Sequence, residues 1–302
     1  MSKYVIYTAC IGGYDDIAQP QYVCDQFDYI LFADCAKSNK CGVWNVVAPK
    51  IEGLSPILLA RYIKTHPHEL LPQYDAWIWV DSNITFSDSF ICERFKNWMN
   101  SLAIIAACPH PATDDVYEHI YEMCYRGVEH DLACLRAMRY LYNNKYPDHH
   151  GLSETGIIFR KNDPQIATFD EQWWWHIQHI SRRDQFSFNY VLYSMSIACE
   201  TILPNNEPIA KSPHLKYGCH SAIAGKRKEV KNNFGEWCRQ YVRHQHPAIY
   251  KPFVAQHKKM SRLKNYSLCL NLWGLLMFPL HLLYVPYTYN SIKRLIAKLR
   301  SK

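Results

Sequence analysis

Short apolar runs that stop at polar turns recur through the first two thirds of this chain and limit its possible folds. The run 76–80 reads AWIWV and is followed at once by Asp81-Ser82-Asn83, and the apolar run 4–10 is followed by paired glycines. Such runs alternate with helical stretches, which predicts an α/β fold with strands in one sheet. We expect strands at 4–10, 29–33, 44–47, 76–80, 102–107 and 156–160, and helices at 56–64, 88–100, 115–126, 130–143, 170–180 and 184–194.

Charge is distributed unevenly along the 302 residues. The net charge of +7 is the sum of an acidic first part and a strongly basic last part of the chain. Residues 211–302 hold 18 of the 34 Lys and Arg residues but only two Glu residues. This shift in composition predicts a globular domain over residues 1–228, followed by a basic linker and tail over 229–302.

The tail contains an apolar segment, residues 268–286, between two basic clusters. Pro279 and Pro286 would break or bend a helix there, and basic residues on both sides disfavour a clean span. We therefore expect a kinked segment on the anionic inner face of a membrane, with residues 258–302 holding a cytoplasmic protein there. A helix of the globular core is the alternative. Nucleic acid is not an expected partner, since no recognition helix or stacking motif accompanies the basic clusters.

The twelve cysteines are scattered and include no C-x-x-C pair. The chain also opens directly on an expected strand without a cleavable leader pattern. We interpret the cysteines as reduced thiols in a cytosol-facing protein. A zinc site that uses Cys108 with His110, or Cys219 with His220, is the competing interpretation.

Polar residues stand where the expected strands end, which is where α/β sheets bind ligands. Asp81 ends the most apolar strand, and Asn83 supplies a second oxygen two residues later. Oxygen ligands of this kind suit a hard divalent cation that shares its coordination shell with phosphates. The alternative is a simple Asx turn.

Two further groups suggest the binding of an anionic ligand. Arg61 and Lys64 are three residues apart on one expected helix and would bind a diphosphate, unless they form a solvated basic face. Asp184 and Gln185 open another expected helix, where Asp184 has the alternative role of an N-cap.

These residues together resemble a glycosyltransferase-like family that was long called a domain of unknown function and includes plant turgor-regulation and seed-mucilage proteins. The match runs in consistent order over about residues 4–195 and leaves out the tail. More distantly, the order of motifs is similar to that of retaining glycosyltransferases with the A-type fold. The resemblance rests on these segments: Tyr7-Thr8, Gly12-Gly13-Tyr14-Asp15, Phe32-x-Asp34, Ala60-Arg61-x-x-Lys64, Pro67-His68, Ile78-Trp79-Val80-Asp81-x-Asn83, Glu154-x-Gly156 and Arg183-Asp184-Gln185.

The family implies a single A-type domain, with a Rossmann-like mixed sheet flanked by helices, and a role for each matched position. Asn83 stands where the Asp-x-Asp motif of the family has its second aspartate, and an amide binds a metal ion more weakly than a carboxylate does. The implied donor-binding residues are Thr8, Tyr14, Asp15, Asp34, Arg61, Lys64 and Lys226; the implied metal ligands are Asp81, Asn83 and His220; the implied catalytic residues are Gln185, Asp184 and Glu154.

The activity implied by the family is transfer of a sugar from a nucleotide diphosphate to a polysaccharide or lipid-linked acceptor. It would use Mn²⁺ or Mg²⁺ and retain the anomeric configuration, with Glu154 as the base if the outcome is inversion instead. Two other functions stay open: a membrane-associated, metal-dependent hydrolase of a lipid, and a nucleotide-sugar-binding protein without catalysis.

Overall fold

The computed structural model describes residues 3–13, 16–34, 38–125, 128–129 and 131–218. Its contacts divide the chain into two compact units, Met1–Asp114 with His149–Gly225 and Asp115–Asp148 with Lys226–Lys302. The predicted boundary at residue 228 and the predicted tail lie outside the described residues. Within the ranges given above, no helix combines the length and apolar character that a membrane span requires.

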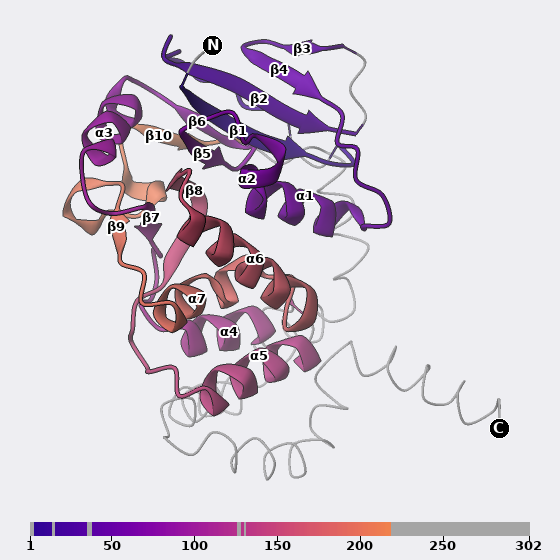
Figure 1. The fold of residues 1–302 in the computed structure, drawn as a ribbon. Helices are drawn as coiled ribbons and strands as arrows, with labels where there is room; N and C mark the ends of the chain where they lie inside the picture. The colour runs from indigo at the N-terminus through magenta and orange to yellow at the C-terminus, as the bar shows by residue number, and fades with distance from the viewer. Residues whose placement is uncertain (1–2, 14–15, 35–37, 126–127, 130, 219–302) are drawn as a thin grey trace, which may run out of the picture. The chain divides into compact units, whose positions relative to one another are not determined.

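The first unit is built on a mixed eight-stranded sheet with the order β3-β4-β2-β1-β5-β8-β7-β9 (Figure 1). Strands β4, β2, β1 and β5 run parallel, whereas β8 is antiparallel to both of its neighbours. A separate antiparallel pair joins β6 and β10. The strands are β1 (Tyr4–Cys10), β2 (Phe27–Ala33), β3 (Lys40–Cys41), β4 (Trp44–Val47), β5 (Ala76–Val80), β6 (Ile84–Phe86), β7 (Ile105–Pro109), β8 (Ser153–Lys161), β9 (Cys199–Thr201) and β10 (Leu215–Tyr217).

The helices of the first unit cover both faces of this sheet. They are α1 (Pro56–Thr65), α2 (Pro67–Leu70), α3 (Phe90–Met99), α6 (Pro164–His179) and α7 (Phe188–Ser194), with a 3₁₀ turn at Asp184–Phe186. Helix α1 begins where the sequence predicts, because Pro56 needs no N–H partner there and the Ser55 hydroxyl accepts from the Leu58 N–H at 3.4 Å.

Alternating side chains on the central strands separate the two layers of helices. Ile6, Ile78 and Phe159 belong to the apolar cluster that also contains the buried face of α3. Side chains next to these in sequence point to the opposite face of the sheet. Tyr7 is one of them, and its hydroxyl donates to the backbone oxygen of Lys64 in α1 at 2.9 Å. This period of two is what a strand imposes, and it places α1 and α3 on opposite faces.

The second unit contains, among the described residues, α4 (Val116–Tyr125) and α5 (Asp131–Asn143). Asp115 begins α4 by accepting from the Tyr117 N–H at 2.7 Å. The Tyr117 hydroxyl in turn donates to the Tyr146 carbonyl at 2.8 Å, which ties α4 to the segment that follows α5.

The expected mixed sheet with flanking helices is confirmed, but several element boundaries differ. The strand predicted from residue 102 begins at Ile105, and Leu102 is fully exposed. Helix α6 begins six residues earlier than predicted because the Asp163 carboxylate caps it at the Gln165 N–H. Asp170 therefore lies inside α6, fully buried.

Candidate functional site

The carboxyl ends of β1, β2 and β5 meet at one edge of the sheet, because these strands are parallel neighbours. Asp81 follows β5 at that edge, and its N–H donates to the Gly156 carbonyl of β8 at 2.8 Å. The Trp79 indole N–H donates to Asp81 Oδ1, also at 2.8 Å. The Asp81 side chain keeps 39% of its surface exposed. The strand end and the indole thus hold a partly exposed carboxylate at the sheet edge.

Asp184 lies buried beside this carboxylate and binds the two basic residues of α1. Its Oδ2 is 2.6 Å from Lys64 Nζ and 3.1 Å from Arg61 Nη1, and it accepts from the Thr155 hydroxyl at 2.9 Å. The side chain of Asp184 therefore binds cations rather than capping a helix. Lys64 has no exposed surface, so the alternative of a solvated basic face does not hold for it.

Lys64 connects the two carboxylates. Its Nζ lies 3.5 Å from Asp81 Oδ1 in addition to the short contact with Asp184. Arg61 lies at the outer side of this group, with 28% of its side chain exposed. In this group Arg61 therefore combines a contact to Asp184 with access to solvent.

The electrostatics of the group follow from these contacts. Burial by itself would raise the pKa of Asp184, but Arg61, Lys64 and the Thr155 hydroxyl hold that pKa well below its usual range. Asp184 is therefore a buried anion at neutral pH.

Glu154 behaves in the opposite way. Burial raises its pKa above the ordinary value, and the nearby Asp81 carboxylate raises it further, against hydrogen bonds from the Tyr217 hydroxyl and the Ile209 N–H. The direction of this shift favours a proton on Glu154.

Gly156 brings β8 close to the segment after β5. A Cβ at this position would lie 2.8 Å from Ile84 Cδ1 and 3.2 Å from Ile209 Cδ1, and 3.7 Å from Asp81 Oδ2. A side chain at this position would therefore displace Ile84 and Ile209 behind the Asp81 carboxylate.

The oxygens at this edge fit a hard divalent cation in chemical type. Asp81 Oδ2 has no hydrogen-bond or ion-pair partner within the described part of the chain, and Asn83 contributes a half-buried amide while its backbone oxygen accepts from Gly218 N–H. Mg²⁺ or Mn²⁺ bound by one carboxylate and one neutral oxygen would need phosphate and water to complete its shell. The predicted third ligand, His220, lies outside the described residues.

The other predicted donor-binding residues are dispersed. Thr8 is fully buried in β1, and within the described residues its hydroxyl has no hydrogen-bond partner. Asp34 is exposed after β2 and accepts from the Gly12 N–H at 2.8 Å, which orders the turn after β1. Gln185 is half-buried beside Asp184. Tyr14, Asp15 and Lys226 lie outside the described residues.

Two contributors to the site were not predicted. Trp79 aligns Asp81, and Tyr217 of β10 binds Glu154 from a strand that sequence analysis did not identify. The alternating pattern of AWIWV would have placed Trp79 on the α1 face of the sheet, whereas a three-residue strand such as β10 carries no periodic signal.

Known glycosyltransferase-like proteins are similar to this chain. The family model described as "TOD1/MUCI70, glycosyltransferase-like domain" matches residues 1–205. No curated protein matches the chain. A solved apo structure of the bifunctional glycosyltransferase WbbM is similar over 67% of this chain and 39% of that one, with 11% identity and a TM-score of 0.37, so this chain spans well under half of WbbM. Because the family model covers more than half of the sequence, the chain belongs to the TOD1/MUCI70 glycosyltransferase-like family.

Proposed function

We propose that this protein is a metal-dependent glycosyltransferase with an A-type domain, which moves a sugar from a nucleotide-diphosphate donor to a polysaccharide or lipid-linked acceptor with retention. Family membership supports the reaction class. The observation that carries the proposal is the joint placement of Asp81, Lys64, Arg61 and Asp184 at the carboxyl edge of the sheet. Departure of a diphosphate builds negative charge, which a divalent cation held by Asp81 would compensate together with the partly exposed Arg61.

Each residue has a defined part in this proposal. Asp81 and Asn83, with His220, would hold a Mn²⁺ or Mg²⁺ ion, which when bound offsets charge on the diphosphate oxygens. Arg61 is the group with exposed surface for a phosphate oxygen, while Lys64 fixes both the Asp81 and Asp184 carboxylates. Gln185 would present its amide near the anomeric carbon.

Glu154 is the proposed group for proton handling. A carboxyl group whose pKa is raised exchanges a proton more readily near neutral pH than an ordinary glutamate does. In a retaining reaction Glu154 would orient the acceptor hydroxyl, and in an inverting reaction it would accept the proton of that hydroxyl. Its contact with Tyr217 holds the carboxylate in place for either task.

The test is an isosteric substitution, Asp81→Asn, assayed with a panel of nucleotide sugars with and without Mn²⁺. The amide keeps the size of the side chain but removes the charge, so we expect donor turnover to fall about 100-fold or more. Asp75→Asn is the matched control, because Asp75 is an exposed aspartate that precedes the opposite end of the same strand, β5.

Four outcomes separate the possible functions. Metal-dependent donor turnover that is lost only in Asp81→Asn supports the transferase. Wild-type turnover in Asp81→Asn contradicts the metal assignment. Cleavage of a lipid with no response to any nucleotide sugar indicates a hydrolase, and a donor-dependent thermal shift without turnover indicates a binding protein. Attachment to the inner face of a membrane through residues 258–302 stays a prediction.

A further inference from the structure

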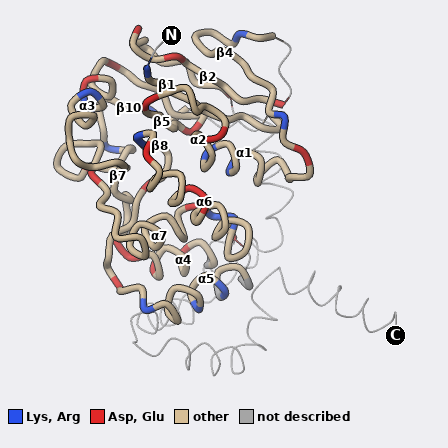
Figure 2. The backbone as a smooth tube through the Cα atoms, viewed as in Figure 1, with Lys and Arg blue, Asp and Glu red and all other residues tan. Residues whose placement is uncertain are grey.

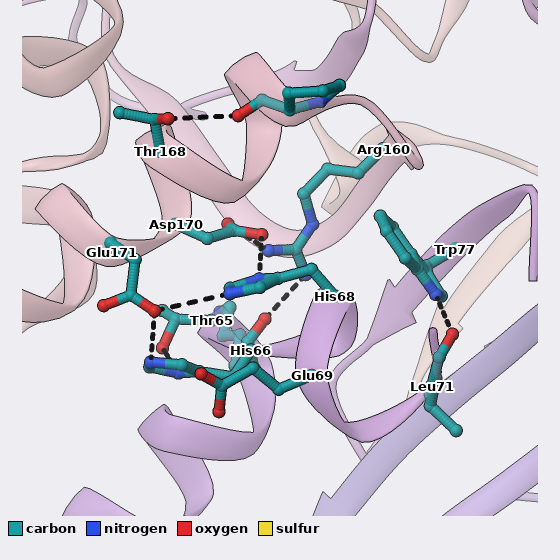
Figure 3. Close-up of polar contacts among 12 residues, drawn as sticks. Thr65, His66, His68, Glu69, Leu71, Trp77, Arg160, Thr168, Asp170 and Glu171 are labelled. Carbon is teal, nitrogen blue, oxygen red and sulfur yellow. Dashed lines mark hydrogen bonds and ion pairs between the residues drawn. The ribbon is translucent and has the colours of Figure 1, made fainter. Parts of the chain in front are cut away.

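A second group of ionisable side chains joins α1 and α2 to α6 in the first unit (Figure 3). It consists of His66, His68, Glu69 and Glu171, which we call the His66–Glu171 cluster. His66 links α1 to α2, His68 and Glu69 lie in α2, and Glu171 lies in α6. Figure 2 marks the acidic residues on α6 and the basic residues on α1. None of the four has a part in the proposed sugar transfer.

The distances within the cluster match those around a tetrahedral zinc ion. One ligand atom each from His68, Glu69 and Glu171 lies within 4.8 Å of the others. Within the described part of the chain, this is the group of histidine, cysteine or acidic side chains that lies close enough together to share a metal ion. Glu171 Oε1 is 3.3 Å from His68 Nε2 and 3.5 Å from His66 Nε2. Zinc bonds of about 2.0–2.1 Å in tetrahedral geometry place ligand atoms roughly 3.3 Å apart.

The other ring nitrogen of each histidine faces an oxygen. His66 Nδ1 lies 3.0 Å from the Tyr62 carbonyl oxygen and 2.9 Å from the Thr65 hydroxyl oxygen, so Nε2 is the nitrogen that faces Glu171. His68 Nδ1 is 3.7 Å from Asp170 Oδ2. Metal-binding histidines are oriented in this way, by a carbonyl or a carboxylate on the nitrogen that does not bind the metal.

The charges of the cluster also match a divalent ion. His66 is only 2% exposed, and its Nε2 lies 3.5 Å from Glu171 Oε1. The carboxylates of Glu69 and Glu171 carry the two negative charges that balance one divalent ion, whereas Asp170 already pairs with Arg160.

We propose that the His66–Glu171 cluster is a zinc site. Both imidazole and carboxylate ligands suit zinc. The site would fix α2 to α6 next to the buried pair of Asp170 and Arg160, and Arg160 Nη2 donates to the Lys64 carbonyl at 2.6 Å. Zinc would thereby support the end of α1 that carries Lys64, without itself touching a substrate.

The test measures zinc bound to the full chain after removal of metal by a chelator and dialysis against Zn²⁺. We expect about one equivalent to be lost in both His68→Gln and Glu171→Gln, and retained in Glu52→Gln, which changes an exposed glutamate in the loop before α1. The Asp81→Asn protein should retain this equivalent as well, since Asp81 belongs to the other site. At free zinc about 100-fold above Kd, the unfolding temperature of the wild type should rise by roughly 5 °C.

Replacement by Co²⁺ identifies the ligands. We expect visible d–d bands without the near-ultraviolet absorption of thiolate ligands, and loss of these bands in Glu171→Gln. Glu171 decides the result if His68→Gln fails to fold, because its side chain is 52% exposed and the substitution leaves the helix intact. No bound zinc in the wild type, zinc retained in Glu171→Gln, or a thiolate spectrum would each overturn the proposal.

Discussion

Replacement of Lys64 by methionine tests how much the buried ion pairs of Lys64 contribute to the free energy of unfolding. The Lys64 ammonium is fully buried and lies 2.6 Å from Asp184 and 3.5 Å from Asp81. Methionine fills a similar volume without charge, so the main loss is electrostatic. Removing one partner of a buried ion pair costs about 3–5 kcal/mol. Because Arg61 still binds Asp184, we expect the lower end of that range, about 3 kcal/mol.

The matched control is Lys96→Met. Lys64 and Lys96 each lie in the last turn of a ten-residue helix, but Lys96 is exposed. Loss of its interaction with the helix dipole should cost only about 0.5 kcal/mol. The assay is unfolding by urea at neutral pH, followed by circular dichroism, with the free energy of unfolding compared between the two variants.

The pH dependence provides the second half of this test. The pKa of Asp184 is depressed in the folded protein, so its ionised form stabilises the fold above the unfolded pKa of about 3.9, and this contribution is lost as pH falls through the folded pKa. Lys64→Met raises the folded pKa of Asp184. The stability gap to wild type should therefore be widest near neutral pH and narrow as the pH falls below about 4. A Lys64→Met protein as stable as Lys96→Met at pH 7, or a gap unchanged by acid, would refute this reasoning.

Two further predictions concern residues beside this group. Gly156→Ala should lower the free energy of unfolding by about 1–3 kcal/mol, because the added methyl would meet Ile84 Cδ1 at 2.8 Å; unchanged stability in urea would show that Ile84 moves aside freely. Tyr217→Phe should raise the pKa of Glu154 further by removing a hydrogen bond to its carboxylate. The variant should be destabilised by about 1 kcal/mol at neutral pH, and the difference should shrink as acid protonates Glu154; a titration of Glu154 by NMR that does not move would contradict the assigned contact.

Local sequence predicted the central elements well. The runs 4–10, 44–47 and 76–80 are strands with the predicted bounds. For 4–10 and 76–80 the reason is that mainly apolar residues between turn residues suit a sheet covered on both faces. The predictions failed where the signal was weak or where a cap lay outside the apolar pattern. Asp163 begins α6 in this way, and the three-residue strands β6 and β10 have too few residues to show a period.

For the candidate site, the sequence identified the residue types but not their partners. Arg61 and Lys64 were expected to face a diphosphate as a pair, and Asp184 was expected to open a helix. In the structure Asp184 binds both of them, across a separation of 120 residues between Lys64 and Asp184. No local pattern predicts such a pairing, since helix propensity and period act over a few residues only.

By itself, the sequence determined where the central strands β1, β4 and β5 form and that Asp81 and other polar groups follow the strand ends, because both follow from the order of neighbouring residues. Only the tertiary structure decided that β8 inserts antiparallel beside β5, which brings Thr155 next to Asp184 and Glu154 near Asp81. The physical reason is that burial of a charge demands a partner of opposite sign in space. Which partner comes within reach depends on the order and direction of the strands, and that order is a property of the packed sheet as a whole.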